Sequence, residues 1–311
     1  MQPLPDVAIE WLTAQGANLS YYDDGWPADA DEIEALIYYS VHIDKPLLDK
    51  LPALRVIGKR GAGVDTLDLA EIERRGIVVT NVGAGGNASS VCEQALTLLT
   101  AATRDVVRRD AFTRAGNFTR RFELPLYEEV GGSRVGIMGA GNIGRRLIEM
   151  LHSALDCKIG VYDPYATTDD LAVRRFDELG DMFSWADNVI IAAPLTEESR
   201  GSVGRHELAL LGPQGVVVVI SRGGIVDEAE LAAALREGDI RAAGVDVYDH
   251  EPPAADHPFY DVPNIVLSPH VAGASRQSRN RTSLMCAQQV WALLHGQPAP
   301  VIDTQPWLAS Q

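Results

Sequence analysis

Apolar runs of buried type alternate with helix-like segments over the first hundred residues. The pattern predicts a helix at 6–15 and short buried strands at 35–40, 54–60 and 76–81, with helical segments between the strands. Such alternation is typical of a parallel sheet whose strands are joined by helices. We therefore expect the chain to begin with an α/β domain.

A longer helical pattern follows these strands. A Ser or Asn between 87 and 90 can cap its start, Glu93 lies near the third helical position, and the pattern extends toward Gly116. Near Thr103 the segment changes from apolar to strongly charged. This change suggests a helix that leaves one core and crosses to another.

A second alternating series contains six apolar strand candidates between residues 134 and 269: RVGIMG, KIGVYD, NVIIAAP, GVVVVIS, AAGVDVY and NIVLSP. Six strands with crossovers of ten or more residues describe a doubly wound sheet with its own core. A last helix is expected from about 275 to 295, and it can return the chain to the first domain. We therefore expect a discontinuous first domain at 1–100 and 276–311, and a second domain at 101–275.

Composition limits the classes of function. The chain has 311 residues, 46% of them hydrophobic and 23% charged, which suits a soluble protein of two domains. Its formal charge of -16 disfavours binding to nucleic acid or anionic membranes. Three scattered cysteines show no metal-ligand spacing, so we expect no metal site. Because no signal peptide or long apolar stretch is visible, we expect a cytoplasmic protein.

The sequence GAGNIG places Gly139, Gly141 and Gly144 in G-x-G-x-x-G spacing. A predicted strand precedes the glycines, a predicted helix follows them, and the next strand ends in Asp163. The glycines permit a tight turn, a close approach of pyrophosphate to the helix start, and close packing of helix on strand. We therefore expect a Rossmann-type dinucleotide site.

Asp163 can accept hydrogen bonds from both hydroxyls of the adenosine ribose, and its charge repels a 2′-phosphate. This favours NAD over NADP. Arg145 and Arg146 argue the other way, although their place on the predicted helix makes them poor readers of that phosphate. A plain strand–turn–helix without ligand is the alternative interpretation of the glycine pattern.

Among the seven histidines, His270 stands out because it lies in LSPHVAG, just beyond the carboxyl end of a predicted strand. In a doubly wound sheet, the carboxyl ends of the strands face the ligand crevice. Arg222 follows another strand, and its fork suits a carboxylate. Asp246 lies within a strand, with Glu251 in the loop after it. An acid/base and an anion anchor at such places indicate a reaction site.

These segments resemble the D-isomer-specific 2-hydroxyacid dehydrogenase family, which includes D-3-phosphoglycerate, glyoxylate/hydroxypyruvate and D-lactate dehydrogenases. The matching motifs are GAGVDTLDL, GAGNIGRRL, APLTEESRG, SRGGIVDEAEL, GVDVYDHEPP and LSPHVAG, in the family's order over about residues 50–275. The resemblance implies a Rossmann cofactor domain inserted into a discontinuous flavodoxin-like substrate domain. It also implies an NAD-dependent oxidoreductase that interconverts a D-2-hydroxy acid and its 2-keto acid.

The resemblance also implies roles for particular residues. Arg222 would bind the substrate carboxylate, His270 would be the general acid and base, and Glu251 would stabilise its imidazolium form. Asp246 would meet the nicotinamide carboxamide. The remaining implied contacts are the cofactor lining by Ala193, Ile220, Ser221 and Ala272, the pyrophosphate contacts of Asn142 and Ile143, and the backbone amides of Ala62 and Gly63 on the substrate carboxylate.

Two basic residues help to predict the class of substrate. Lys59 and Arg120 match places where phosphoglycerate dehydrogenases hold a phosphate, the second one from the neighbouring subunit. A substrate with a second anionic group, of the 3-phosphoglycerate or 3-sulfolactate type, is therefore expected. Ordinary solvated basic residues are the alternative. By the same resemblance we expect a homodimer that uses the charged half of the long helix and the segment RRFELPLYEE.

Other functions stay open at this point. A glyoxylate/hydroxypyruvate reductase would carry the same motifs. Relatives of this fold also serve as NAD-sensing corepressors, and the Arg222, Glu251 and His270 set does not exclude such a binding module. An enzyme that oxidises formate is disfavoured because formate dehydrogenases pair the active histidine with glutamine, whereas phosphite remains open. Gln94 stands where a histidine is common in the family.

Overall fold

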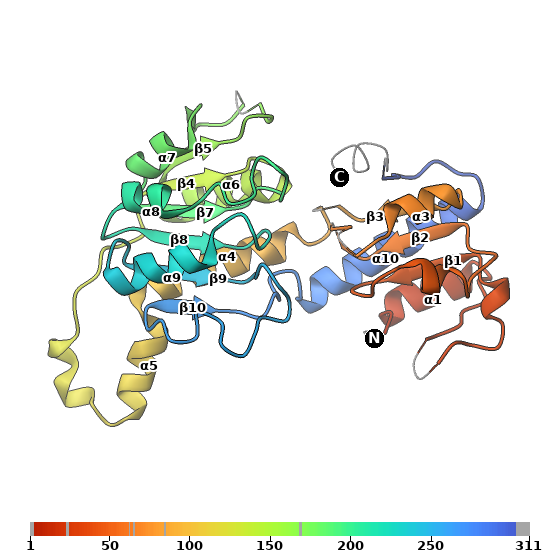
Figure 1. The fold of residues 1–311 in the computed structure, drawn as a ribbon, viewed down its shortest axis with the longest axis horizontal. Helices are drawn as coiled ribbons and strands as arrows, with labels where there is room; N and C mark the ends of the chain where they lie inside the picture. Colours follow the sequence, from red (N-terminus) through yellow and green to blue (C-terminus); the bar gives the residue numbers. More distant parts are fainter. Residues whose placement is uncertain are drawn as a thin grey trace. The chain divides into compact units, whose positions relative to one another are not determined.

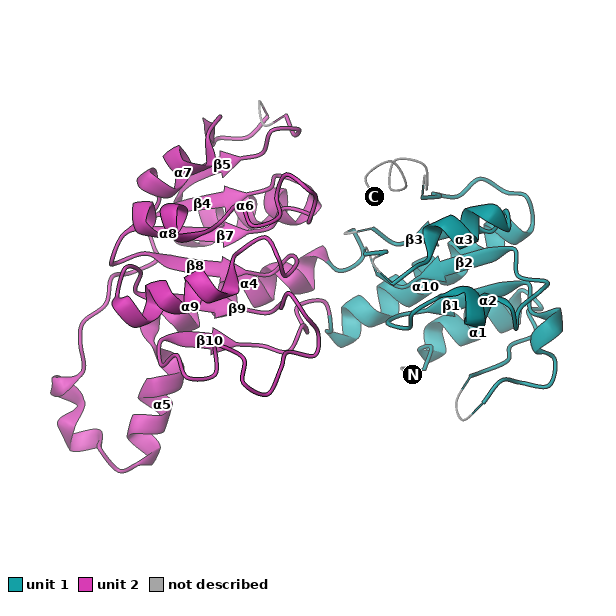
Figure 2. Cartoon of the chain, in the orientation of Figure 1, with its two compact units in different colours: residues 1–87, 274–311 teal, residues 88–273 magenta. Residues whose placement is uncertain are grey.

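A computed structural model describes residues 3–22, 25–61, 63–64, 66–83, 85–167 and 170–302. The chain divides into two compact units (Figure 2), one made of residues 1–87 with 274–311 and the other of residues 88–273. The second unit is thus inserted into the first, and both sheets are parallel. The expected α/β class is confirmed.

The first unit is built on a parallel sheet in the order β1-β2-β3, formed by Ala35–Tyr38, Val56–Lys59 and Val78–Asn81. Helix α10 (Arg276–Leu294) packs on all three strands, and α1 packs on α10 (Figure 1). Gly58 permits this approach, because a Cβ there would lie 2.7 Å from the Cys286 sulfur. The other helices of this unit are α1 (Asp6–Ala14), η1 (Ala30–Glu32), α2 (Lys45–Leu48) and α3 (Leu69–Arg74).

The second unit is a doubly wound sheet in the order β10-β9-β8-β7-β4-β5-β6, with every neighbouring pair parallel. Its strands are β4 (Arg134–Met138), β5 (Lys158–Tyr162), β6 (Arg174–Phe176), β7 (Asn188–Ile191), β8 (Val216–Val219), β9 (Ala242–Val245) and β10 (Ile265–Leu267). The chain places β5 and β6 to one side of β4 and the later strands to the other. This reversal creates a switch point between β4 and β7, where such folds bind ligands.

Two helical layers cover this sheet. The helices are α4 (Ala88–Arg104), α5 (Val106–Arg114), η2 (Phe118–Glu123), α6 (Asn142–Leu155), α7 (Leu179–Trp185), α8 (Arg205–Leu211) and α9 (Glu228–Glu237). One core joins α4 and α6 to the sheet, and another joins α7, α8 and α9 to it. Helix α4 crosses β9 so closely that a Cβ on Gly244 would lie 2.7 Å from the Leu98 Cβ.

Three details differ from the sequence expectations. The first domain boundary falls between 87 and 88 rather than between 100 and 101, because the apolar face of α4 packs on the second unit's own sheet. The return falls between 273 and 274 rather than between 275 and 276. The long helix does not cross between cores either: it breaks at Asp105, whose φ is 51°, and α5 buries none of its residues.

Strand β6 was also missed, because three residues with two exposed arginines give no apolar pattern. Within the described ranges, no helix is long and apolar enough to cross a membrane.

Candidate active site at the carboxyl edge of the second sheet

The glycine turn joins β4 to α6 at the switch point. Gly139 has a φ of 98°, and a Cβ there would lie 2.7 Å from the backbone nitrogen of Ala193. A Cβ on Gly144 would overlap the carbonyl oxygen of Gly139. Gly141 differs, since nothing lies within 4 Å of its Cβ position. The turn is therefore closed toward the protein and open at the start of α6, where backbone N–H groups favour a phosphate.

Asp163 follows β5 and faces the glycine turn. Its Oδ2 atom accepts the Ala140 N–H at 2.7 Å, and its Oδ1 atom accepts the N–H groups of Tyr165 and Ala166, each at 2.9 Å. Burial opposes the charge, but the three donors and the nearby Arg175 outweigh it and lower the pKa of Asp163. The carboxylate is therefore ionised at neutral pH.

Arg145, whose charge would favour NADP, contacts other residues of the chain. Its Nη1 atom lies 2.7 Å from a carboxylate oxygen of Asp170, and its Nη2 atom donates to the Thr167 carbonyl. Both partners belong to the loop after β5. The guanidinium is therefore already committed to two acceptors in this loop.

The ends of β7 and β8 complete a cradle for a dinucleotide. Ala193 and Ile220 are buried at these ends. Ser221 has a buried hydroxyl that, in the part of the chain described, has no hydrogen-bond partner. Asn142 and Ile143 form the first turn of α6. A turn open at Gly141, an orphaned hydroxyl and an ionised carboxylate at one sheet edge fit a bound nicotinamide dinucleotide.

His270 and Glu251 form a close pair on the loops after β10 and β9. The Nδ1 atom of His270 lies 2.7 Å from Oε2 and 2.8 Å from Oε1 of Glu251. Because a carboxylate only accepts, Nδ1 carries the hydrogen and Nε2 is left to exchange a proton. The His270 side chain is 44% exposed, which leaves it accessible to a substrate. Its φ of 52° is unusual for a residue with a side chain, so the loop must be held firmly.

Asp246 holds that loop. Its carboxylate is fully buried and accepts from the Ser268 hydroxyl at 2.5 Å and from the N–H groups of Val271 and Ala272 at 3.1 and 2.9 Å. Its own carbonyl accepts the His270 N–H at 2.8 Å. In this structure Asp246 thus positions His270, and the contact to the nicotinamide carboxamide stays a prediction.

Helix α4 holds the same loop from the other side. Ser90 donates to the Ala272 carbonyl at 2.8 Å, and Gln94 donates to the Ser268 hydroxyl at 2.9 Å. The two residues are one helical turn apart and therefore share a face of α4. Gln94 is thus joined to Asp246 through a single hydroxyl.

Arg222 is brought to the same edge by a close backbone approach. It follows β8, which neighbours β9 in the sheet. A Cβ on Gly223 would overlap the carbonyl group of Tyr248, so only glycine allows this packing. The Tyr248 N–H donates to Glu251 Oε1 at 3.2 Å. The Arg222 turn and the Glu251 loop therefore pack directly against each other.

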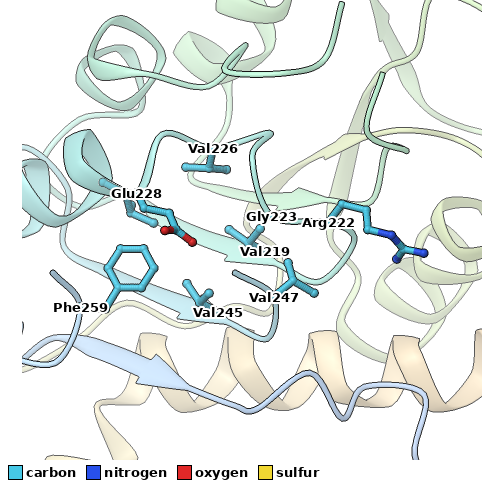
Figure 3. Close-up of a pocket in the computed structure, with 9 residues that line it drawn as sticks. Val219, Arg222, Gly223, Val226, Glu228, Val245, Val247 and Phe259 are labelled. Carbon is cyan, nitrogen blue, oxygen red and sulfur yellow. The ribbon is translucent and has the colours of Figure 1, made fainter. Parts of the chain in front are cut away.

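The close-up in Figure 3 shows the space behind this turn. A void of about 10 Å³ is lined by Glu228, Val245, Phe259 and neighbouring residues. Arg222 contributes to the lining, but its guanidinium points away from the void (Figure 3). Its Nη1 atom donates to the Ser221 carbonyl at 2.7 Å.

The other predicted substrate residues are placed differently. Lys59 and Gly63 belong to the first unit, whereas Ala62 lies outside the described residues. The Lys59 side chain is buried, donates to the Tyr39 carbonyl, and lies over the Tyr38 ring at 4.7 Å. Arg120 belongs to η2 and pairs with Glu123 at 2.6 Å. Both basic side chains therefore contact other residues of the same chain.

Sequence reasoning missed several residues that hold the site. Gln94 was noted only as a departure from a family pattern, and Tyr248, Ser268 and Glu228 were not singled out. His257 was one of seven histidine candidates without a distinguishing signal. Among the described residues, no group of three or more His, Cys, Asp or Glu side chains is arranged to hold a metal ion.

Comparison with known proteins agrees with this geometry. Residues 96–272 match the sequence model "D-isomer specific 2-hydroxyacid dehydrogenase, NAD binding domain". The glyoxylate reductase of Aeropyrum pernix is 34% identical over 280 residues, covering 88% of this chain and 82% of that protein. The D-3-phosphoglycerate dehydrogenase of Archaeoglobus fulgidus is 28% identical over 305 residues, covering 96% of this chain and 57% of that protein.

The chain spans about half the length of the phosphoglycerate dehydrogenases that it matches. A solved structure of similar fold is the NADPH-dependent glyoxylate/hydroxypyruvate reductase of Sinorhizobium meliloti in complex with citrate. It has a TM-score of 0.86 and 27% identity, covering 98% of this chain and 96% of that one. The match to the NAD-binding domain and the 34% identity over most of the chain lead to one conclusion: the chain belongs to the D-isomer specific 2-hydroxyacid dehydrogenase family.

Proposed function

We propose that the protein interconverts a D-2-hydroxy acid and its 2-keto acid with NAD. The observation that carries this proposal is the pair of His270 and Glu251, with Nδ1 and Oε2 2.7 Å apart, at the sheet edge that also holds the glycine turn. Bound NAD would supply the hydride acceptor for oxidation, and NADH the donor for reduction. The chain's own residues supply the proton transfer and the binding of the acid.

The proposed role of each residue follows from its hydrogen-bond chemistry. In oxidation His270 takes the hydroxyl proton on Nε2, and in reduction the imidazolium returns it to the forming alkoxide. Glu251 offsets the positive charge of that imidazolium. Arg222 binds the substrate carboxylate and polarises the neighbouring carbonyl, since its planar fork suits a carboxylate.

NAD is proposed over NADP on the basis of Asp163. Its ionised carboxylate accepts ribose hydroxyls and repels a 2′-phosphate. Arg145, one of the two arginines on α6 that favour NADP, is paired with Asp170. The Sinorhizobium meliloti relative is named as NADPH-dependent, so the comparison of the two cofactors is a direct test of this point.

The substrate is proposed to be a small 2-keto or 2-hydroxy acid held through one carboxylate. In the structure Lys59 donates to the Tyr39 carbonyl and Arg120 pairs with Glu123. A second anionic group on the substrate is therefore supported by the sequence positions of the two residues and not by the contacts of their side chains. Relatives named as phosphoglycerate dehydrogenase and as glyoxylate reductase match at similar identity.

A substrate panel tests the proposal. NADH oxidation would be followed with glyoxylate, hydroxypyruvate and pyruvate, and NAD reduction with glycerate, lactate, 3-phosphoglycerate and 3-sulfolactate. We expect turnover of at least one of the keto acids with NADH. Binding of NADH without turnover of any of these acids would instead favour the NAD-sensing binding module.

A homodimer is proposed from the exposed apolar side chains that follow α4. Phe118, Phe122 and Leu126 are 62%, 85% and 97% exposed, and Val106 and Val107 on α5 are also exposed. Such a cluster on a projecting segment favours burial against a partner. A second copy of the chain is the proposed partner, and light scattering after size-exclusion chromatography measures the assembly.

A further inference from the structure

A second histidine–carboxylate pair lies behind the active site. The Nε2 atom of His257 is 2.9 Å from Oε2 of Glu228, the first residue of α9. This pair is much more buried than the first, with only 8% of the His257 side chain and 19% of the Glu228 side chain exposed. The Phe259 N–H donates to Nδ1 of His257 at 3.4 Å, so Nε2 carries the hydrogen and donates to Glu228.

The other oxygen of Glu228 holds the loop that carries Glu251. Oε1 of Glu228 accepts the Asp249 N–H at 2.9 Å. The preceding amide, that of Tyr248, donates to Glu251 at 3.2 Å. Two consecutive backbone amides are thus bound by two different carboxylates. A displacement of Glu228 would therefore move the amide that orients Glu251.

Tyr248 connects this buried pair to the remaining active-site segments. Its ring meets the His257 ring edge-on, with centroids 5.6 Å apart, and its hydroxyl donates to the Ser268 carbonyl at 3.1 Å on the His270 loop. Its carbonyl packs against Gly223, next to Arg222. Figure 3 shows Glu228 and Phe259 close together, with Arg222 directed away from them.

Stability alone gives little reason to keep such a pair. Burying a charged carboxylate costs desolvation energy, and apolar residues of similar volume usually stabilise a core at least as well. A pair of this kind has a different use, because it fixes hydrogen-bond geometry at a neighbouring loop. Burial raises the pKa of Tyr248 to about 12, and the neighbouring Tyr260, Asp246, Glu228 and Glu251 act in the same direction. The phenol therefore stays neutral and keeps its hydrogen for Ser268.

We propose that Glu228 and His257 are positioning residues that hold the 248–251 segment and thereby fix Glu251 against His270. This inference rests on the proposed function of His270 as the acid and base. Neither residue contacts the substrate. They act on the rate through the geometry of Glu251 and on the pH dependence through the charge that Glu251 presents to His270.

Two substitutions at one position separate positioning from bulk stability. His257→Leu replaces the imidazole with an apolar side chain of similar size and removes the donor to Glu228, whereas His257→Gln retains an N–H donor. Glu230→Gln is the matched control, because Glu230 lies two residues after Glu228 on α9, is 43% exposed, and lies 3.9 Å from Arg205. Kinetics, the Kd for NADH and Tm would be measured for each variant.

His257→Leu is expected to lower kcat of keto-acid reduction about 10- to 100-fold, the loss typical of a small misplacement of catalytic groups. The alkaline fall in kcat/KM should move to lower pH, because a displaced Glu251 stabilises the imidazolium less. His257→Gln should recover most of both effects, and the Kd for NADH should not change. In the cofactor-free protein, the amide hydrogens of Tyr248 and Asp249 should exchange faster in His257→Leu than in His257→Gln.

The proposal is overturned if His257→Leu keeps the wild-type pH profile and the wild-type exchange of the Tyr248 and Asp249 amides, whatever its Tm. It is also overturned if His257→Gln and His257→Leu behave alike in kcat and pH profile. His270→Ala distinguishes this failure from failure of the proposed function. An active His270→Ala protein would refute the function itself, whereas an inactive one with unaffected His257 variants would refute only the positioning role.

Discussion

The Nδ1 atom of His270 lies 2.7 Å from Oε2 of Glu251, although the two residues are on different loops. The geometry is produced by the parallel sheet, because β9 and β10 are neighbours and end at one edge. Asp246, Tyr248 and Gln94 then restrain the loops. The arrangement defines which ring nitrogen can meet a substrate, and it makes the account open to direct tests.

Glu251→Gln keeps the side-chain size and a hydrogen-bond acceptor but removes the charge. We expect kcat/KM for reduction to fall about tenfold, since a charge-assisted hydrogen bond is about 1.4 kcal/mol stronger than a neutral one. The pH at which reduction is half-maximal should also decrease. Steady-state kinetics across pH measure both effects, and an unchanged pH profile would contradict the role of Glu251. Glu230→Gln again provides a charge-neutralising control on an exposed surface.

Asp163→Ser removes the carboxylate at the end of β5. We expect the ratio of kcat/KM with NAD to that with NADP to fall about 10- to 100-fold, because hydrogen bonds to a charged group contribute about 1.5–3 kcal/mol. Kinetics with both cofactors measure the ratio. If Asp163→Ser discriminates as well as the wild type, the assignment of NAD to this carboxylate is wrong.

The pH dependence of this preference follows from the lowered pKa of Asp163. A carboxyl group with a lowered folded-state pKa stays charged until the pH falls through that lowered value, and its contribution is present at all higher pH. The part of the preference that comes from NAD binding to this carboxylate, measured as the ratio of the Kd for NAD of Asp163→Ser to that of the wild type, should therefore be constant from about pH 8 down to the unfolded carboxyl pKa of about 3.9. A decline of that ratio between pH 7 and 5 would contradict the direction of the shift.

Gly141→Ala and Gly144→Ala should behave in opposite ways. The Cβ of Gly141→Ala meets no protein atom within 4 Å, so the Tm should stay near that of the wild type while the Kd for NADH rises. The Cβ of Gly144→Ala meets the Gly139 carbonyl, so the fold itself should be destabilised by about 1–3 kcal/mol, as in overpacked cores. Thermal unfolding and fluorescence titration with NADH compare the two. Equal NADH affinity of Gly141→Ala and the wild type would exclude this turn as the pyrophosphate site.

Phe122→Arg tests the proposed dimer surface. Phe122 is 85% exposed on η2 and packs with Arg121, whose guanidinium carbon lies 4.3 Å from the ring centroid. A third consecutive arginine there should shift the protein toward a monomer without lowering its Tm as a monomer. Tyr165→Arg, at a 75% exposed aromatic on another loop, is the control. A monomeric wild type in light scattering would refute the dimer.

The parts of the site that lie within short sequence motifs could be predicted from the sequence. The glycine turn, Asp163 and the strand ends at Arg222 and His270 each follow from a short pattern. The break at Asp105 could not be predicted, since a charged helix pattern continues through the residue where the backbone takes a φ of 51°. The link between Glu228 and His257 spans 29 residues without any spacing rule, and only the folded chain reveals it.

The difference between position in a motif and side-chain contacts also explains why the substrate could not be predicted from sequence. Lys59 and Arg120 were chosen by position in motifs, and position says nothing of what their side chains contact. In the folded chain Lys59 turns to the Tyr39 carbonyl and Arg120 to Glu123. Arg222 was chosen in the same way, and here the packing of Gly223 against Tyr248 places it beside the Glu251 loop.

The role of His270 as the acid and base is tested by His270→Ala, assayed for keto-acid reduction and for NADH binding in the same preparation. We expect kcat to fall about 10²- to 10⁴-fold, the contribution of a general acid and base, with the Kd for NADH nearly unchanged. Retention of wild-type turnover by His270→Ala would contradict this role.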